Sequence, residues 1–345
     1  MKIRLRSTKK YKKRGVKYIG NCLTGDKVRT AMERLKPIVH QTPLLTSTTT
    51  NELLGKDVYF KMENQQKTGA FKYRGASFKM MQLPKEELNK GVVTASAGNH
   101  AQGVAHAAAQ LGVKATIFMA EKTPLAKVDA TRSYGAEVVL IGENFQEAYE
   151  ASLRKQAQDD CVYIHPFDDY DIMAGQGTIG LEMLEQEKNI DTILVPIGGG
   201  GLISGMAVAV KEQNPNVKVI GVQASKATPV YENYHQKKLN NLNSPTIAEG
   251  IAVKQPGTHT LPLINKYVDD IVTVTDEEIA SAMVYMLERN KSLIEGAGAA
   301  TLAALFTHNK RIQSKHCGVV VSGGNMDIGS LPKIQKLAKR MHFTA

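Results

Sequence analysis

Short apolar runs alternate with amphipathic segments along most of this 345-residue chain. Residues 57–62 alternate apolar and polar positions with the period of a half-buried strand, whereas Ile279, Met283 and Met286 share one face of a helix in 276–290. Eight more segments have the character of strands: 91–96, 115–120, 136–141, 161–166, 192–197, 217–222, 270–275 and 317–322. Helical segments separate many of them, so the pattern predicts an α/β fold of parallel sheets covered by helices.

Two segments need a closer look. The first helix is expected to begin with Asp26 as its N-cap and to end at Pro37. The stretch 192–210 has no charged residue and is long enough to suggest a membrane span. A proline and five glycines interrupt this stretch, so we expect a strand, a loop and a helix instead.

The net charge of +11 is concentrated at the N-terminus. Residues 1–20 contain nine basic side chains and no acidic one, which leaves 11 − 9 = +2 for the rest of the chain. Such a block is typical of a flexible, solvated tail, and binding to nucleic acid or to an acidic membrane surface is the alternative. Cys22, Cys161 and Cys317 are odd in number and irregularly spaced, which predicts a reducing, cytoplasmic compartment. No signal-peptide pattern follows the basic start.

Three loops follow predicted strands, at the edge where open α/β sheets bind ligands. Residues 198–201 are four consecutive glycines before a helical segment, where backbone N–H groups can approach a phosphate. Residues 96–100 could hold a carboxylate in the same way, although a plain N-cap by Ser96 is an equal alternative. His100 could be a base, but a structural role is more common for a histidine at a helix start. The loop 322–325 is by itself an ordinary turn.

The segment 68–76 places Lys72 directly after Phe71. Apolar surroundings lower the pKa of a lysine and free its amine for covalent chemistry with an aldehyde. A single lysine is seldom catalytic. The company of a phosphate loop, a carboxylate loop and a strand-end serine makes Lys72 a candidate nucleophile of a pyridoxal 5′-phosphate enzyme.

Seven motifs in this order resemble those of the fold-type II pyridoxal-phosphate enzymes. Within them the chain is most similar to the threonine/serine dehydratases, and there to the catabolic threonine dehydratases (threonine ammonia-lyases). The motifs are TGAFKYRGA (68–76), TASAGNHAQGVA (94–105), AGQGTIGLE (174–182), VPIGGGGLISG (195–205), TIAEGIAVK (246–254), EGAGA (295–299) and VSGGN (321–325).

The resemblance spans about residues 25–330 and implies a tryptophan synthase β-like fold. This fold has two three-layer α/β/α domains with mostly parallel sheets. We expect a large cofactor-binding domain from 21–88 and 166–345, a small domain from 89–165, and the tail at 1–20.

The resemblance also implies a role for each candidate residue. Lys72 would bind the cofactor covalently and move the α-proton. Asn99 would bond the pyridine 3′-oxygen and Ser322 would face the ring nitrogen, with Phe71 and Glu295 beside the ring. The phosphate would be held by Gly198, Gly199, Gly200, Gly201 and Leu202. The substrate carboxylate would be held by Ser96, Ala97, Gly98, Asn99 and His100.

The implied reaction is elimination of the β-hydroxyl group, which converts L-threonine to 2-oxobutanoate and ammonia, and L-serine to pyruvate. A serine racemase or serine dehydratase of the same fold is the alternative. Racemases of this group carry Ser where this chain has Ala97, and they place metal-binding acids in the segment that corresponds to 223–229, which has none here. We therefore expect elimination and no metal. Two departures from the family are Ala70 for the usual Ser and Glu249 for the usual Asp.

The resemblance further implies a homodimer or homotetramer and activation by an AMP-type nucleotide. Only twenty residues follow Asn325, so the regulatory domain of the biosynthetic dehydratases and its feedback by isoleucine are not expected. The expected partner is a small amino-acid substrate, and neither nucleic acid nor a membrane. A non-catalytic nucleotide- or nucleic-acid-binding protein is the alternative from another class.

Overall fold

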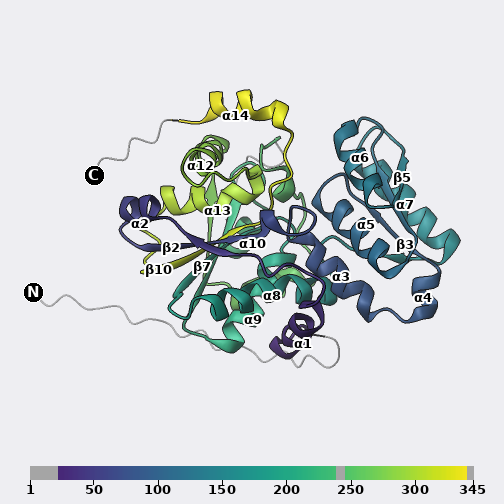
Figure 1. Cartoon of the computed structure of the whole chain (residues 1–345), viewed down its shortest axis with the longest axis horizontal. Helices are drawn as coiled ribbons and strands as arrows, with labels where there is room; N and C mark the ends of the chain where they lie inside the picture. Colours follow the sequence, from purple (N-terminus) through teal and green to yellow (C-terminus); the bar gives the residue numbers. More distant parts are fainter. Residues whose placement is uncertain (1–21, 238–244, 340–345) are drawn as a thin grey trace, which may run out of the picture.

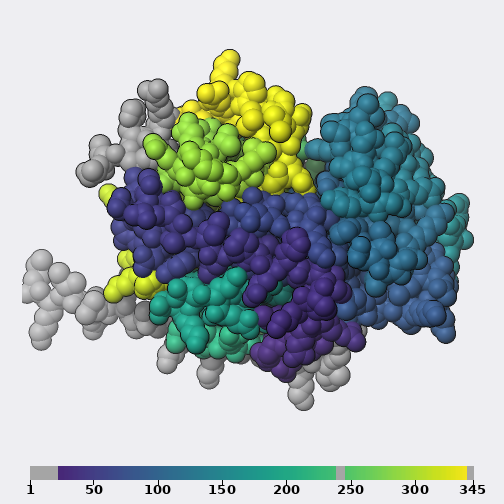
Figure 2. All heavy atoms as spheres, viewed as in Figure 1, coloured from purple at the N-terminus to yellow at the C-terminus, as the bar shows by residue number. Residues whose placement is uncertain are grey.

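The computed structural model describes residues 22–237 and 245–339, which form two bodies, each built around one β-sheet (Figure 1). In the space-filling view the body with the smaller sheet is a separate lobe, coloured blue to teal (Figure 2). The expected tail, 1–20, lies outside the described residues.

The larger sheet has six strands in the order β1-β2-β10-β7-β8-β9. All neighbouring strands are parallel except β1 and β2, which pair antiparallel at the edge. The three-residue strand β1 was not predicted. The strands are β1 Leu44–Thr46, β2 Asp57–Met62, β7 Thr192–Pro196, β8 Lys218–Ala224, β9 Asp270–Val274 and β10 His316–Val321.

The smaller sheet has four parallel strands in the order β5-β4-β3-β6. They are β3 Val92–Ala95, β4 Ala115–Met119, β5 Glu137–Leu140 and β6 Val162–Tyr163. Every strand of this sheet therefore comes from one continuous part of the chain, whereas the larger sheet combines segments before and after it. The exact domain boundaries, at 88/89 and 165/166, remain a prediction.

Helices cover both faces of each sheet. Successive strand residues point to opposite sides, and here apolar residues on both sides must be buried. Val319 and Val321 of β10 join the core under α12 and α13, while Val320 between them joins the core under α8 and α9. In the smaller body, α5 and α7 contribute to separate cores of the four-stranded sheet. The predicted architecture of two three-layer α/β/α domains with mostly parallel sheets is confirmed. These six helices are α5 Asn99–Leu111, α7 Phe145–Asp159, α8 Tyr170–Gln186, α9 Gly201–Gln213, α12 Asp276–Arg289 and α13 Gly296–Thr307.

The remaining helices connect these layers. The α-helices are α1 Gly25–Leu35, α2 Thr48–Leu54, α3 Lys72–Gln82, α4 Lys85–Asn89, α6 Leu125–Ser133, α10 Pro229–His235, α11 Thr260–Tyr267 and α14 Leu331–Leu337. Three short 3₁₀ helices are η1 Glu63–Gln65, η2 Glu249–Ile251 and η3 Ile328–Ser330. Helix α3 packs against both α5 and α8 and so joins the two bodies.

Two of the closer predictions can now be judged. Asp26 is not the N-cap of α1: the extended Thr24 fills that position, and its hydroxyl accepts a hydrogen bond from the Lys27 N–H at 3.2 Å. The uncharged stretch 192–210 does fold as strand, loop and helix. Across the described ranges, no helix combines the length and apolar character needed to cross a bilayer.

Candidate active site

Residues 68–71, which lead into Lys72 and are called the lysine loop below, pair through their backbone with the segment that follows β10. The Phe71 N–H donates to the Ser322 carbonyl at 3.1 Å, and the Gly324 N–H donates to the Gly69 carbonyl at 2.9 Å. Between these bonds, Ala70 and Gly323 form an isolated antiparallel bridge. Because α3 begins at Lys72, this pairing fixes where the lysine leaves the sheet edge.

The Lys72 amine is desolvated and, in the described part of the chain, has one hydrogen-bond acceptor. Its Nζ donates to the Pro166 carbonyl at 2.7 Å and lies 5.3 Å from the centre of the Phe71 ring. Burial lowers the pKa of Lys72 to about 8, and the negative charge of Glu295 offsets part of this effect. About a tenth of the amine is therefore neutral and nucleophilic at pH 7, far more than for a lysine with its usual pKa.

A chain of amide and carboxyl groups lies beside this lysine. The Asn99 Nδ2 donates to Glu295 Oε1 at 2.6 Å, and the Asn325 Nδ2 donates to Asn99 Oδ1 at 2.9 Å and to the Thr68 carbonyl at 2.7 Å. Burial raises the pKa of Glu295 to about 7, although the hydrogen bond from Asn99 opposes the rise. Asn325 therefore links the lysine loop to the predicted pair Asn99 and Glu295, a role that was not predicted for it.

The glycine loop has the shape of an anion cradle. Gly200 has a φ of +98°, which favours glycine, and it precedes α9 without a side-chain cap. A Cβ at Gly199 would lie 2.5 Å from the Phe167 ring, and one at Gly201 would lie 2.8 Å from the Phe167 carbonyl oxygen. In the described part of the chain, no hydrogen bond uses the N–H groups of residues 199–202. They remain available for a phosphate.

A turn at 165–168 connects the glycine loop to the lysine. The His165 Nδ1 accepts hydrogen bonds from the Phe167 N–H at 3.2 Å and the Asp168 N–H at 2.8 Å. This turn directs the Pro166 carbonyl to Lys72 and packs Phe167 against the glycines. The turn was missed in the sequence, although it follows the carboxyl end of β6, the same signal that identified the other three loops.

The loop 96–100 leaves the start of α5 uncapped. Gly98 occupies the N-cap position without a side-chain hydrogen bond, while Ser96 Oγ accepts from the Gly98 N–H at 3.2 Å, so the alternative of Ser96 as a plain N-cap is wrong. The N–H groups of residues 99–101 have no partner among the described residues. They can hold a carboxylate, as can the adjoining Ala97 backbone, whereas the Gly98 N–H is already bonded to Ser96.

His100 belongs to the loop only through its backbone. Its buried ring forms a 2.9 Å hydrogen bond between Nε2 and the Ile164 carbonyl, and burial lowers its pKa to about 3. The imidazole is therefore neutral and donates this bond to the neighbouring chain segment. Its geometry fits the structural role, not that of a base.

Ser322 directly follows the end of β10, its carbonyl bonds the Phe71 N–H, and the residue is only 2% exposed. Within the described residues its hydroxyl forms no hydrogen bond, so it is available for a ligand. The adjacent Gly323 leaves room beside the site, because a Cβ there would lie 2.4 Å from Glu295 Oε1.

These features fit pyridoxal 5′-phosphate. The group needs an amine of lowered pKa for its aldehyde, a backbone cradle for its phosphate and polar partners around its ring. Lys72, the glycine loop, and Asn99 with Ser322 offer these in one place. The individual roles expected for the candidate residues remain proposals.

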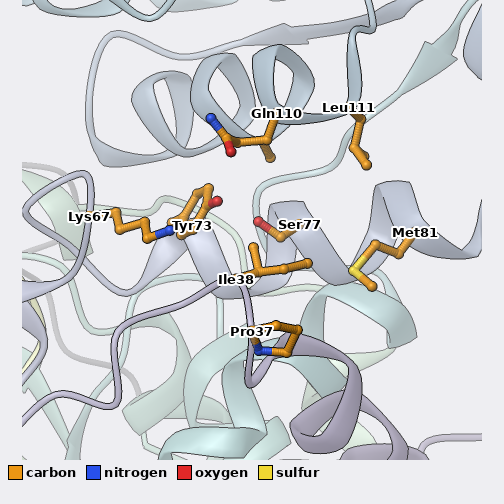
Figure 3. A pocket seen from close by; sticks show the side chains of 9 residues that line it. Pro37, Ile38, Lys67, Tyr73, Ser77, Met81, Gln110 and Leu111 are labelled. Carbon is orange, nitrogen blue, oxygen red and sulfur yellow. The ribbon is translucent and has the colours of Figure 1, made fainter.

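A different cavity lies between α3 and α5, with a volume of about 150 Å³. The hydroxyls of Tyr73 and Ser77 face it without a hydrogen-bond partner (Figure 3). Burial raises the pKa of Tyr73, and the nearby Ser77 hydroxyl offsets some of this rise, yet the two groups fall short of hydrogen-bond geometry. None of the expected site residues lines this cavity.

Comparison with known proteins agrees with this geometry. A family model described as pyridoxal-phosphate dependent enzyme matches residues 35–323. An L-threonine ammonia-lyase of Thermotoga maritima is 47% identical over 313 residues, which cover 90% of this chain and 78% of that protein. The catabolic L-threonine dehydratase TdcB of Staphylococcus aureus is 44% identical over 308 residues, or 87% of this chain and 88% of that one.

Among solved structures, maize serine racemase superimposes with a TM-score of 0.86 at 37% identity, covering 92% of this chain and 98% of that one. The resemblance drawn from the motifs is thereby confirmed at the level of the family. The chain belongs to the pyridoxal-phosphate-dependent enzymes of this fold, with pyridoxal phosphate as its cofactor.

Proposed function

We propose that this enzyme is an L-threonine ammonia-lyase, which converts L-threonine to 2-oxobutanoate and ammonia and also accepts L-serine. The observation that carries the proposal is the Lys72 amine, whose pKa is lowered to about 8. The amine donates to the Pro166 carbonyl, and the next residue, Phe167, packs against the glycine loop. The names of the relatives from Thermotoga maritima and Staphylococcus aureus support the substrate.

The chain's own residues supply binding and proton transfer. When bound, pyridoxal phosphate supplies a ring that stabilises negative charge on the substrate α-carbon. The neutral Lys72 Nζ takes the α-proton, because its lowered pKa leaves it partly unprotonated at working pH. The Pro166 carbonyl orients this amine for the transfer.

Backbone groups bind the two anionic ends. The N–H groups of 199–202 hold the phosphate, and those of 99–101 hold the substrate carboxylate, since both helix starts lack a side-chain cap. Glu295 and Asn325 fix the orientation of the Asn99 side-chain amide. Ser322 offers a neutral hydroxyl to the ring nitrogen and therefore places no carboxylate there.

Serine racemase chemistry is the competing proposal because the maize enzyme has the same fold. Racemisation needs a second proton carrier on the face opposite Lys72. Ala97 occupies the position before Gly98 where racemases of this group carry a serine, and a methyl group cannot transfer a proton. This residue favours elimination.

The test combines product analysis with a covalent label. Purified protein incubated with L-threonine and with L-serine should release 2-oxo acid and ammonia, with little D-serine by chiral analysis. Borohydride reduction followed by peptide mass analysis should place the cofactor on Lys72. D-serine as the main product would replace the proposal by a racemase, and a cofactor bound elsewhere would overturn the site.

The remaining partners belong to the same proposal. We propose a homodimer or homotetramer, an AMP-type activator and a cytoplasmic location, the last supported by three free cysteines. Light scattering tests the oligomer. A titration of AMP against the rate of 2-oxobutanoate release tests the effector, and an unchanged rate would remove it.

A further inference from the structure

The motif at 174–182 lies outside the candidate site, although it is one of the seven that identified the family. It forms the middle of α8, which packs against α3 on one side and α9 on the other (Figure 1). Helix α3 begins at Lys72 and α9 begins at the end of the glycine loop. The motif is therefore positioned between the amine and the phosphate cradle.

Its first face holds the start of α3 at backbone distance. A Cβ at Gly175 would lie 2.7 Å from the Arg74 carbonyl oxygen, so only glycine permits this approach. The Gln176 Oε1 accepts a hydrogen bond from the Gly75 N–H at 3.1 Å. Glu182 accepts two hydrogen bonds from the Arg74 guanidinium, at 2.6 and 2.9 Å.

The second face holds α9 in the same way. A Cβ at Gly177 would lie 2.6 Å from the Gly205 carbonyl oxygen, and a Cβ at Gly205 would lie 2.0 Å from the Met173 carbonyl oxygen. Both obstacles are backbone atoms, which cannot move without moving a helix. Gly180, one turn further, differs: there the nearest atom is a side-chain methyl of Val210, at 2.9 Å.

We infer that α8 is a spacer that fixes the distance between the Lys72 amine and the phosphate-binding glycine loop. Gly177 and Gln176 are positioning residues in this inference, since neither touches the site. The spacing matters because one cofactor must reach both ends at once, through a covalent bond at Lys72 and hydrogen bonds at 199–202. The inference deepens the proposed function and rests on it.

The experiment compares two alanine substitutions on the same face of the same helix. Gly177→Ala forces the Gly205 backbone away, whereas Gly180→Ala displaces a side chain. Two probes are titrated by fluorescence. Pyridoxal 5′-phosphate bonds Lys72 and the cradle, whereas pyridoxine 5′-phosphate has an alcohol in place of the aldehyde and cannot form the covalent bond to Lys72.

For Gly177→Ala we expect the affinity for pyridoxal 5′-phosphate to fall at least ~10-fold and that for pyridoxine 5′-phosphate to fall less than ~3-fold, because only the spacing has changed. Gly180→Ala should leave both affinities within ~2-fold of wild type. Equal losses for the two probes would mean a damaged cradle, and unchanged affinities would mean that the spacing is irrelevant. Either result overturns the inference.

A second pair of variants covers the case in which Gly177→Ala does not fold. Gln176→Met removes the acceptor of the Gly75 N–H, and Gln186→Met makes the same change near the end of α8, where Gln186 bonds Lys61 and the Thr42 carbonyl. Only Gln176→Met should weaken the binding of pyridoxal 5′-phosphate more than that of pyridoxine 5′-phosphate. A purely structural effect would lower the melting temperature of both variants and leave the ratio of the two affinities unchanged.

An experiment on the wild-type protein shows whether a negative result refutes the spacer role of α8 or the proposed function itself. If borohydride does not fix pyridoxal phosphate on Lys72 of the wild type, the site itself is wrong. If it does, and the variants show no difference between the probes, the site stands and the spacer is wrong.

Discussion

Lys72 and Arg74 are two cations only two positions apart on α3, yet their surroundings are opposite. Lys72 has one carbonyl acceptor, and burial lowers its pKa to about 8. Arg74 is fully buried and donates hydrogen bonds to both oxygens of Glu63, each at 2.8 Å, and of Glu182, at 2.6 and 2.9 Å. Burial opposes the charge on Arg74 too, but the two carboxylates outweigh it and raise its pKa.

The surroundings of the two cations therefore suit Lys72 to chemistry and Arg74 to holding the structure together, although both lie on the first turn of α3. A buried cation whose charge is fully compensated stays protonated and holds its neighbours together. A buried cation with a single neutral acceptor has a proton to lose. Lys61 lies between the two kinds: its Nζ bonds Glu182 at 2.6 Å, the Thr42 carbonyl at 2.8 Å and Gln186 at 2.9 Å, yet burial outweighs the nearby carboxylates and lowers its pKa.

Removing the reactive amine should have the largest effect on activity. We expect Lys72→Ala to lower the rate of 2-oxobutanoate release on the order of 10³-fold or more, because it removes the amine proposed to bond the cofactor and take the α-proton. Its melting temperature without cofactor should not fall, since the substitution removes a desolvated amine. A continuous 2-oxo-acid assay and a thermal melt measure the two effects, and a rate within tenfold of wild type would contradict the assigned role.

Removing the side chain of Arg74 should instead lower the stability of the protein. Arg74→Ala leaves Glu63 and Glu182 buried without their main partner, and we expect a loss of roughly 3–5 kcal/mol in the free energy of unfolding. Urea unfolding measures it. Arg74→Lys is the matched control: it keeps the charge but cannot bond both carboxylates in the same way, so its loss should be intermediate. Free energies within 1 kcal/mol of wild type for both would contradict the comparison.

The same contrast explains what the sequence could and could not predict. Lys72 was found because it follows an apolar residue and because three loops elsewhere in the chain, each recognisable from its own residues, are what a pyridoxal-phosphate site requires. The partners of Arg74 were not found, because Glu182 lies 108 positions away and nothing local connects the two. Pro166 was missed for another reason, since a backbone carbonyl carries no side-chain signature.

The strands that could be predicted from the sequence also have a signal in their own residues. Apart from the two-residue β6, each strand that was predicted has at least four residues in a largely apolar run, such as the fully buried Ala115–Met119. Strand β1 has three residues, none of them fully buried, and forms only because β2 offers an edge. Asp26 was chosen as the cap because its residue type fits, whereas the position of the first helical turn selected Thr24.

A third variant sharpens the comparison by changing the charge that faces Lys72. Burial raises the pKa of Glu295 to about 7 from 4.5, so the folded chain holds a proton that the unfolded chain has lost. The stabilisation this gives is complete below pH 4.5 and disappears as the pH rises through 7. In cofactor-free Glu295→Gln this dependence should vanish, and the variant should gain melting temperature on wild type between pH 4.5 and 7.5.

The same variant should also change the lysine. Glu295 raises the pKa of Lys72, so its replacement by a neutral amide should move the pKa of Lys72 below about 8. The pH dependence of Lys72 modification by an amine reagent, followed by peptide mass analysis, measures this midpoint. A midpoint that moves upward would contradict the placement of Glu295 beside the amine.

The smallest effect is expected from an exposed ion pair between the two bodies. Lys127 of α6 donates to Glu249 of η2 at 2.7 Å, and the positive charge of Lys127 lowers the pKa of Glu295. Lys127→Ala should cost only about 0.2–1 kcal/mol in unfolding free energy, because solvent screens the pair. It should nevertheless raise the pKa of Glu295 further, which extends the acid-side stabilisation to higher pH. Lys90→Ala, which breaks the exposed pair with Asp160 within the smaller body, is the control and should leave that midpoint unchanged. Equal midpoints in the two variants would show that the charge of Lys127 does not reach the site.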